Sequence, residues 1–310
     1  MQHSPLGPTG LQVSQVALGT APLGGGLFGD CDEQQAERVV HEALDLGITL
    51  VDTSPYYGDA EERLGRALRG GRRDRVVLAT KAGRYGGGDF DFSAARIRSS
   101  LQRSLDLLQT DHVDVFQLHD VEFVPLEQIR EVAVPALLAL REEGLVRAVG
   151  VTGYPVETLC ALVEEFDLDV VLTYAHATLL DDSLMTRVLP VASANGTAVM
   201  NAAAVSLGLL TPSGGSMAAD HPASPVIREA AAAVVALCER EGVDVAQLAN
   251  QYSIQRSGAA TTVIGTRKPA NVRAAVEAAS EPIDEELLSA VLALRPPADQ
   301  RTWPAGGWRS

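Results

Sequence analysis

Cysteine is scarce in this chain of 310 residues, which contains only three. They are Cys31, Cys160 and Cys238, an odd number at spacings that match no zinc-binding pattern. Neither a disulfide framework nor a structural zinc site is expected, and a chain of this length buries enough surface to fold without either. We expect idle thiols in a reducing compartment and no bound metal.

Basic residues are also few: the chain has 25 Lys and Arg and 40 Asp and Glu, so its net charge is −15. Such an acidic surface repels nucleic acid and anionic membranes, and neither is an expected partner. No apolar run approaches the roughly 20 residues that span a bilayer, and the N-terminus lacks the basic start and apolar core of a signal peptide. We expect a soluble, cytoplasmic protein.

Short β-branched runs alternate with longer helix-period patterns along almost the whole chain. The predicted strands are 16–19, 49–52, 76–81, 114–118, 148–152, 170–174, 198–203 and 262–264. The predicted helices are 33–46, 94–108, 126–143, 183–195, 226–241 and 244–256. Eight strands alternating with helices predict an α/β fold of the (β/α)8 type, the TIM barrel.

No Pro- or Ser-rich linker and no charge block divides the chain, so residues 1–310 are predicted to form one domain. A Gly-Pro-Thr-Gly turn within 7–13 predicts a short hairpin before the first barrel strand. Extra helices are expected at the C-terminus. Residues 211–224, rich in Gly, Ser and Pro, are too long for an ordinary connection and are predicted to form a loop over the site.

Three predicted strands in succession end in residues that can move a proton. Asp52 ends the second strand, Lys81 the third and His119 the fourth, while Tyr57 lies on the loop after the second. Because barrel strands are neighbours in sequence order, these side chains are expected to converge at the C-terminal mouth. Each residue alone also has an ordinary structural interpretation, and it is their coincidence that favours catalysis.

The chemistry open to this group is acid–base catalysis. A tyrosine of ordinary pKa, near 10, is a poor base at neutral pH, and a nearby ammonium lowers that pKa. Lys81, held by Asp52, is expected to act in this way on Tyr57. His119 is expected to hydrogen-bond the substrate oxygen, while a cofactor takes the hydride.

Motifs around these residues resemble the aldo-keto reductase family, whose members are (β/α)8 barrels that use NAD or NADP and no metal. The resemblance is carried by Asp-Thr-Ser-x-x-Tyr-Gly at 52–58, Glu62-x-Leu64-Gly65, Ala79-Thr80-Lys81 and Leu118-His119-Asp120. It implies that Tyr57 is the acid/base residue, with Lys81 and Asp52 as partners. It further implies that His119 orients the substrate.

Further segments are similar to the branch of this family that contains L-galactose dehydrogenases and the L-fucose and D-threo-aldose 1-dehydrogenases. These segments are 19–24, 90–93, 149–153, 221–225 and 302–304. The resemblance implies an NAD(P)-dependent enzyme of carbohydrate metabolism. Its expected reaction oxidises the anomeric carbon of a free aldose, of the L-galactose or L-fucose type, to a lactone.

Two other functions stay open at this point. One is an NADPH-dependent reductase of aldehydes or ketones in secondary metabolism or detoxification. The other, of a different class, is a non-catalytic subunit that senses the cofactor for a partner protein. The sequence specifies neither the sugar nor the physiological direction nor the oligomeric state.

By the same resemblance, the cofactor is expected across the late strands. The implied cofactor residues are Gly19, Thr20, Ala21, Thr152, Gly153, Thr173, Ala203, Val205, Gly208, Gly265, Thr266, Arg267 and Asn271. Gly153 lacks the side chain that usually holds the nicotinamide amide, and Thr173 stands where many members have Gln. A helix starting near Ala270 offers its N-terminus to a phosphate. Arg267 and Lys268 either bind the 2′-phosphate of NADP or are solvated, so the choice between NAD and NADP stays open.

The segment 24–29 matches the pattern G-x-G-x-x-G, but no helix opens directly after it, which favours a loop beside the barrel mouth. Polar residues near the strand ends are candidate substrate contacts, since a hydroxyl-rich ligand needs donors and acceptors. The candidates are Tyr56, Tyr85 in the loop 84–89, Asp120 and His176. Each has an equally good interpretation as a solvated loop residue.

Overall fold

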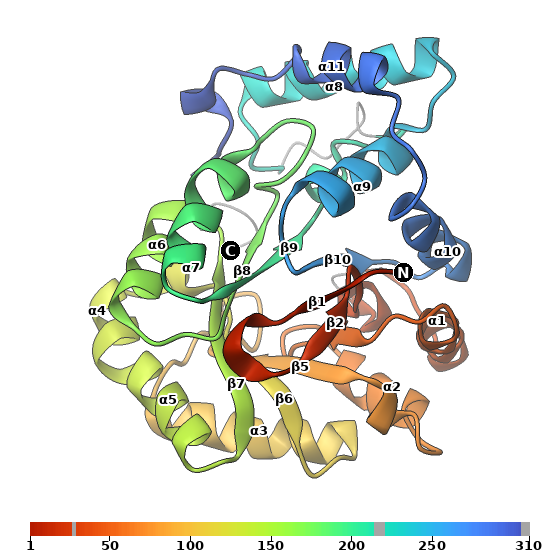
Figure 1. The fold of residues 1–310 in the computed structure, drawn as a ribbon. Coiled ribbons are helices and arrows are strands. Elements are labelled where there is room, and N and C mark those ends of the chain that lie inside the picture. The colour runs from red at the N-terminus through yellow and green to blue at the C-terminus, as the bar shows by residue number, and fades with distance from the viewer. Residues whose placement is uncertain (27–28, 214–220, 305–310) are drawn as a thin grey trace.

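Eight parallel strands close into a barrel in this computed structural model, which describes residues 1–26, 29–213 and 221–304. The barrel strands are β3 (Val16–Gly19), β4 (Leu50–Asp52), β5 (Val77–Ala82), β6 (Val113–Leu118), β7 (Val146–Gly153), β8 (Val170–Tyr174), β9 (Ala198–Ala202) and β10 (Thr261–Gly265). They pair in sequence order, and β10 pairs with β3 to close the ring (Figure 1). The predicted TIM barrel is confirmed, and every strand bound lies within two residues of its prediction.

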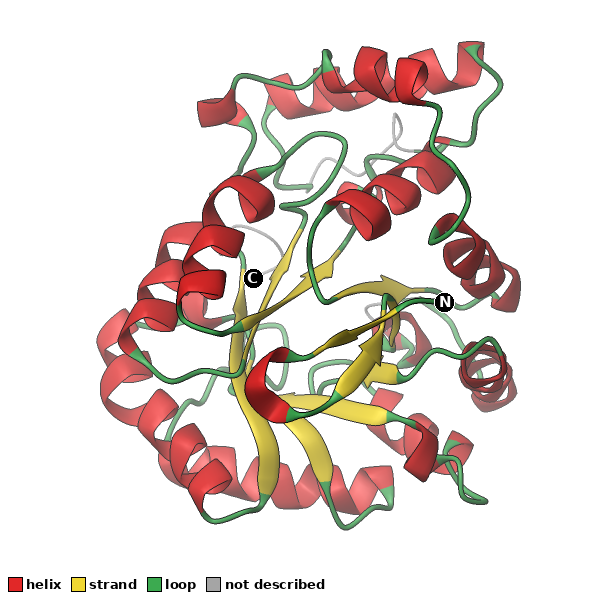
Figure 2. Ribbon diagram, in the orientation of Figure 1, coloured by secondary structure: helices red, strands yellow, loops and turns green. Residues whose placement is uncertain are grey.

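Helices cover the outside of the barrel (Figure 2). The longer ones are α1 (Glu33–Asp45), α2 (Ala60–Ala67), α3 (Ala94–Leu108), α5 (Val134–Glu142), α6 (Val156–Glu165), α7 (Leu189–Ala194), α8 (Pro225–Arg240), α9 (Val245–Arg256), α10 (Pro269–Ala278) and α11 (Glu285–Leu292). In α1, Ala36, Val39, Val40 and Ala43 recur at the helical period and are buried. Helices α8 and α11 share a separate apolar cluster and lie together at the top of Figure 1.

Two of the predicted helices are interrupted by wide π turns. The predicted helix 126–143 begins as the short α4 (Leu126–Gln128), widens over Ile129–Ala133 and continues as α5. The predicted helix 183–195 widens in the same way over Leu184–Val188 before α7. The second residue of α5 and of α7 is a proline. Proline has no N–H, and its ring clashes with the carbonyl four residues earlier, so the regular α-helical hydrogen bonds cannot run through it.

The barrel interior at the N-terminal ends of the strands is apolar. Ala17, Leu50 and Val115 belong to one buried cluster there. The expected N-terminal hairpin, β1 (His3–Pro5) paired with β2 (Gln12–Ser14), is present. Val13 of β2 and Leu6, which follows β1, are fully buried in the same cluster. A polar ligand therefore has to enter from the opposite, C-terminal mouth.

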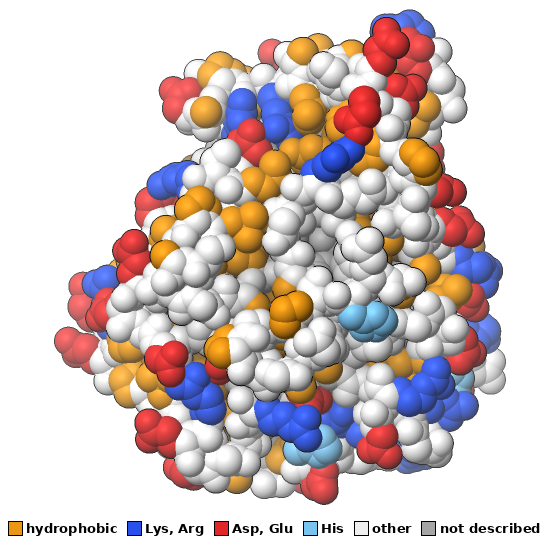
Figure 3. All heavy atoms as spheres, in the orientation of Figure 1, with side chains coloured by type: hydrophobic (Ala, Val, Ile, Leu, Met, Phe, Trp, Pro, Cys, Tyr) orange, Lys and Arg blue, Asp and Glu red, His pale blue; other side chains and the backbone are white. Residues whose placement is uncertain are grey.

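The surface in Figure 3 carries acidic and basic side chains interspersed around its rim, so the net charge of −15 is not gathered into one patch on this face. Within the described ranges no helix is long and apolar enough to cross a membrane, and no group of three or more His, Cys, Asp or Glu could hold a metal ion. The single-domain extent of 1–310, the cytoplasmic location and the lack of a nucleic-acid partner stay predictions.

Candidate active site

A cavity of about 800 Å³ opens at the C-terminal ends of the barrel strands. Its lining includes Asp52, Tyr57, Lys81 and His119, the residues predicted to move a proton. Asp52 ends β4, Lys81 is the last but one residue of β5, and His119 directly follows β6. Because β4, β5 and β6 are adjacent in the barrel, side chains that are distant in sequence meet here.

Lys81 and Asp52 form a buried ion pair between neighbouring strands. Lys81 Nζ donates to Asp52 Oδ2 over 2.6 Å and to the carbonyl oxygen of Thr53 over 2.8 Å. Burial raises the pKa of the Asp52 carboxyl, and the Lys81 ammonium opposes that rise. The positive charge of Lys81 is thus compensated within the pair.

Tyr57 lies beside this ion pair, with Lys81 Nζ 5.0 Å from the centroid of its ring. The pKa of Tyr57 is raised well above its usual value, first by burial and then by the negative charges of Asp52 and Asp120. This corrects the expectation that Lys81 lowers the pKa of Tyr57. Asp52 already compensates the ammonium, so the cost of burying a phenolate dominates, and Tyr57 is a neutral phenol at neutral pH.

His119 packs edge-on against Tyr57, with ring centroids 5.5 Å apart. Its Nδ1 lies 2.9 Å from Ser54 Oγ, and its Nε2 lies 3.8 Å from Asp120 Oδ2. Burial lowers the pKa of His119 well below its usual value, and the positive charges of Lys81 and Arg84 lower it further. The imidazole is therefore neutral at neutral pH.

A second cluster of polar side chains borders the cavity and consists of Arg84, Asp120 and Tyr56. Arg84 donates to the Asp120 carboxylate and, over 3.0 Å, to the Tyr56 hydroxyl. Its guanidinium also lies 3.9 Å from the centroid of the Tyr56 ring. Tyr56 and Asp120 were predicted to meet the substrate, and both line the cavity. Arg84 takes the place expected for Tyr85, which packs against Arg96 and does not line the cavity.

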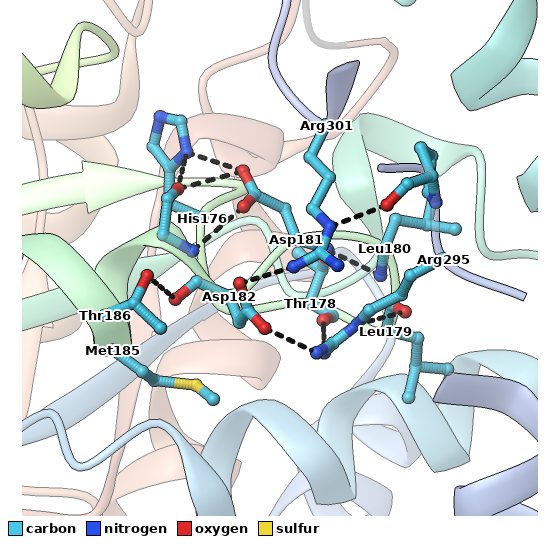
Figure 4. A network of polar contacts seen from close by, with 12 residues as sticks. His176, Thr178, Leu179, Leu180, Asp181, Asp182, Met185, Thr186, Arg295 and Arg301 are labelled. Carbon is cyan, nitrogen blue, oxygen red and sulfur yellow. Dashed lines mark hydrogen bonds and ion pairs between the residues drawn. The ribbon is translucent and has the colours of Figure 1, made fainter. Parts of the chain in front are cut away.

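His176, also predicted to contact the substrate, is buried behind the cavity wall and does not line it. Its Nδ1 lies 2.8 Å from both Asp181 Oδ2 and Ser183 Oγ (Figure 4). Its Nε2 lies 2.7 Å from the carbonyl oxygen of Tyr154. The structure therefore gives His176 a supporting place on the loop after β8, where a closed network of hydrogen bonds joins it to the residue that follows β7.

The segment after α11 is anchored to the loop that follows β8. Asp182 on that loop accepts hydrogen bonds from Arg295 over 3.0 Å and from Arg301 over 2.7 Å (Figure 4). Arg295 also donates to the carbonyl oxygens of Thr178 and Leu179. One carboxylate thus holds two arginines of the C-terminal segment.

This anchored segment supplies part of the cavity wall through Trp303. The indole stacks on Tyr154, with ring centroids 4.8 Å apart and planes 19° from parallel, and the backbone N–H of Trp303 donates to the Tyr154 hydroxyl over 3.1 Å. Trp303, Tyr154 and Tyr174 all line the cavity. Sequence reasoning assigned Trp303 and Tyr154 no role. The only signal was that 302–304 matches the sugar dehydrogenase branch.

The remaining lining fits a nicotinamide dinucleotide. Small residues form a wall that a flat ring can approach closely: Gly19, Ala21, Ala202, Ala203, Ala204 and Gly265. Elsewhere in the cavity, Thr266 and Asn271 lie at the start of α10, where the N-cap residue Lys268 makes no side-chain capping bond. The N–H groups of Lys268 and Asn271 are bonded to Thr266 Oγ1 and to the carbonyl oxygen of Lys268, and Pro269 has none. The positive end of the helix dipole still favours a phosphate there.

The predicted cofactor residues divide into two sets. Those that line the cavity are Gly19, Ala21, Thr152, Ala203, Val205, Gly265, Thr266 and Asn271. Those outside the lining are Thr20, Gly153, Thr173, Gly208 and Arg267. Thr173 lies between Leu172 and Tyr174, which both line the cavity, so strand alternation turns its side chain to the other face of β8. At Gly153, the position of a Cβ would lie 2.6 Å from Glu122 Oε2.

Two glycine-rich stretches have residues outside the described ones, namely 27–28 and 214–220. In the motif 24–29, Gly24 packs so closely on the loop that carries Tyr57 that a Cβ there would lie 1.6 Å from the carbonyl oxygen of Tyr57. Helix α1 begins only at Glu33, which agrees with a loop beside the barrel mouth. In the predicted loop 211–224, Thr211 lines the cavity.

Arg267 donates to the carbonyl oxygen of Asp30 over 2.7 Å and so contacts the loop before α1.

Glu61 is a supporting residue to which the sequence analysis assigned no role. Glu61 is buried and accepts from Thr80 Oγ1 over 2.6 Å, next to Lys81 in β5. Glu62, the residue matched to the motif, lies at the surface and pairs with Arg66.

A sequence model described as the aldo/keto reductase family matches residues 15–295. The chain is 40% identical to L-galactose dehydrogenase of Arabidopsis thaliana, over 97% of this chain and 96% of that protein. It is 30% identical to D-threo-aldose 1-dehydrogenase of a Pseudomonas species, over 85% of this chain and 88% of that protein. The holo form of an aldo-keto reductase from Bacillus halodurans matches its fold with a TM-score of 0.76 at 25% identity, over 96% of this chain and 97% of that one.

The Asp182→Ala variant tests the anchoring of the C-terminal segment. Removing the shared carboxylate leaves Arg295 and Arg301 without their common partner, so segment 295–304 should exchange its amide hydrogens faster. Hydrogen exchange followed by mass spectrometry should show this increase there, with β4 to β6 unchanged. The matched control is Asp299→Ala, an exposed carboxylate in the same segment. Equal exchange in both variants would contradict the anchoring.

Proposed function

Because the chain belongs to the aldo/keto reductase family, we propose that it oxidises the anomeric carbon of a free aldose, of the L-galactose or L-fucose type, to a lactone. The chain is an NAD(P)-dependent oxidoreductase, and its cofactor is NAD or NADP. The observation that carries the proposal is one cavity that joins a buried proton-carrying tyrosine to polar groups and aromatic faces suited to a sugar.

The polar and aromatic parts of the lining support a sugar in different ways. The hydroxyl groups of an aldose need both donors and acceptors, which Arg84, Asp120 and Tyr56 offer. Its C–H faces suit the rings of Tyr174 and Trp303. A small number of polar groups in an otherwise apolar lining fixes the orientation of a bound ligand.

In the proposed reaction, Tyr57 receives the proton of the C1 hydroxyl group as the C1–O bond becomes a carbonyl. When bound, NAD or NADP accepts the hydride that leaves C1. The reaction uses the small fraction of Tyr57 that is ionised, and Lys81, held by Asp52 and by the carbonyl oxygen of Thr53, partly offsets the charge of that phenolate. His119 hydrogen-bonds the reacting oxygen beside Tyr57.

Carbonyl reduction is a second candidate, and the protonation of Tyr57 favours it. A phenol at neutral pH is already in the form that donates a proton to a carbonyl oxygen. The substrate would then be an aldehyde or ketone, with the same residues used in the reverse sense. Direct comparison of the two directions at neutral pH decides between them.

A panel of free aldoses tests the proposal. L-galactose, L-fucose and related sugars, assayed separately with NAD and NADP, should reduce at least one cofactor. Tyr57→Phe should lower kcat/KM by about 10²- to 10⁴-fold, because it removes the proton acceptor, while the cofactor still binds in a fluorescence titration. The matched control is Tyr85→Phe, which deletes a hydroxyl with no partner among the described residues.

Two outcomes would contradict the proposal. One is that the wild-type protein turns over no free aldose with either cofactor. The other is that Tyr57→Phe and Tyr85→Phe oxidise the sugar equally well.

The raised pKa of Tyr57 sets the direction of the pH dependence. Oxidation needs the phenolate, whose fraction rises with pH, so kcat/KM for aldose oxidation should increase steadily up to about pH 10. Carbonyl reduction uses the phenol and should stay nearly constant between about pH 7 and about pH 9. His119 is neutral throughout this range and adds no further titration. A plateau of the oxidation rate below about pH 8 would contradict the raised pKa.

A further inference from the structure

Ser54 is a buried hydroxyl at the centre of the site to which the proposed reaction assigns no role. It lies two residues after Asp52 and is fully buried. Its Oγ accepts a hydrogen bond from the backbone N–H of Tyr56 over 3.1 Å. The same oxygen lies 2.9 Å from His119 Nδ1.

The hydrogen on Ser54 Oγ needs an acceptor. A serine hydroxyl has one hydrogen and two lone pairs, and one lone pair already accepts from Tyr56. Among the described residues, His119 Nδ1 is the one acceptor in hydrogen-bonding distance of this oxygen. If Nδ1 carried a hydrogen, Ser54 would accept twice and its own hydrogen would be buried without a partner, which is costly. Ser54 therefore donates to Nδ1.

The other side of the ring leads independently to the same result. His119 Nε2 lies 3.8 Å from Asp120 Oδ2, a carboxylate oxygen that also accepts from Arg84. A bare Nε2 lone pair would face this negative oxygen and be repelled by it. A hydrogen on Nε2 would be attracted to it. The neutral ring carries only one such hydrogen.

We propose that Ser54 is a positioning residue that, together with Asp120, holds His119 as the neutral tautomer with its hydrogen on Nε2. Nδ1 is occupied by Ser54, so Nε2 is the nitrogen left to meet a ligand in the cavity. His119 then donates a hydrogen bond from Nε2 to the reacting oxygen of the substrate. Because Nε2 already carries a hydrogen, it does not compete with Tyr57 for the proton of the C1 hydroxyl group. This consequence for catalysis rests on the proposed function, whereas the tautomer does not.

The first test needs no variant of Ser54. Long-range ¹H–¹⁵N correlation spectra of the ¹⁵N-histidine-labelled wild-type protein report which ring nitrogen bears the hydrogen. The His119 signals are assigned by their loss in His119→Gln. The expected result at neutral pH is a protonated Nε2 and an unprotonated Nδ1. The reverse pattern, or an average of the two tautomers, would overturn the proposal.

The second test compares Ser54→Ala with Ser54→Thr, which keeps the hydroxyl. In Ser54→Ala, the two ¹⁵N shifts of His119 should move toward each other, because the ring samples both tautomers. The kcat for the aldose should fall by about 10-fold with cofactor affinity unchanged, since a fraction of the rings no longer donates through Nε2. Ser54→Thr should restore the wild-type shifts.

The spectra separate failure of this inference from failure of the proposed function. If Ser54→Ala leaves the His119 shifts as in the wild type, Ser54 does not set the tautomer and the proposal is wrong, whatever the activity. If no aldose is oxidised but the His119 shifts change as expected, the role of Ser54 in setting the tautomer is supported and only the proposed reaction is wrong.

Discussion

The rest of the site depends on the buried ion pair between Lys81 and Asp52. Taking two charges out of water costs several kcal/mol per ion, so the pair persists only with close contact and further hydrogen bonds. The 2.6 Å bond between neighbouring strands and the carbonyl oxygen of Thr53 meet that condition. Within the pair, Asp52 compensates the positive charge of Lys81, which alone would favour the ionised form of Tyr57. The site at rest therefore holds a proton on Tyr57, beside a neutral His119.

Around this centre, the barrel separates apolar from polar groups along its axis. The N-terminal end is closed by the hairpin with Leu6 and Val13, and the C-terminal mouth carries the polar cavity. The cavity wall is completed from the far end of the chain, where Asp182 anchors the segment that places Trp303 on Tyr154. The small residues of the lining leave room for the cofactor, and the start of α10 borders the same cavity.

Much of this was predictable from sequence, because the features are local or repeat along the chain. Strand periodicity predicted the barrel, and strand ends predicted that Asp52, Lys81 and His119 meet. The sign of the Tyr57 pKa shift was not predictable, since it depends first on how deeply the phenol is buried and then on the nearby charges of Asp52 and Asp120. Thr173 does not line the cavity because side chains alternate between the two faces of a strand, and His176 does not because the direction of a loop side chain follows no such period. The pairing of Tyr154 with Trp303 joins distant segments, and no local pattern records it.

Transfer of deuterium from C1 of a free aldose tests the central claim most directly. The protein is incubated with a sugar of the L-galactose type that carries deuterium at C1, together with NAD or NADP, and the products are identified by NMR and mass spectrometry. We predict that the deuterium moves to the reduced cofactor and that an aldonolactone without deuterium is released. Deuterium retained on every aldose, while the same protein reduces aldehydes with the reduced cofactor, would contradict it.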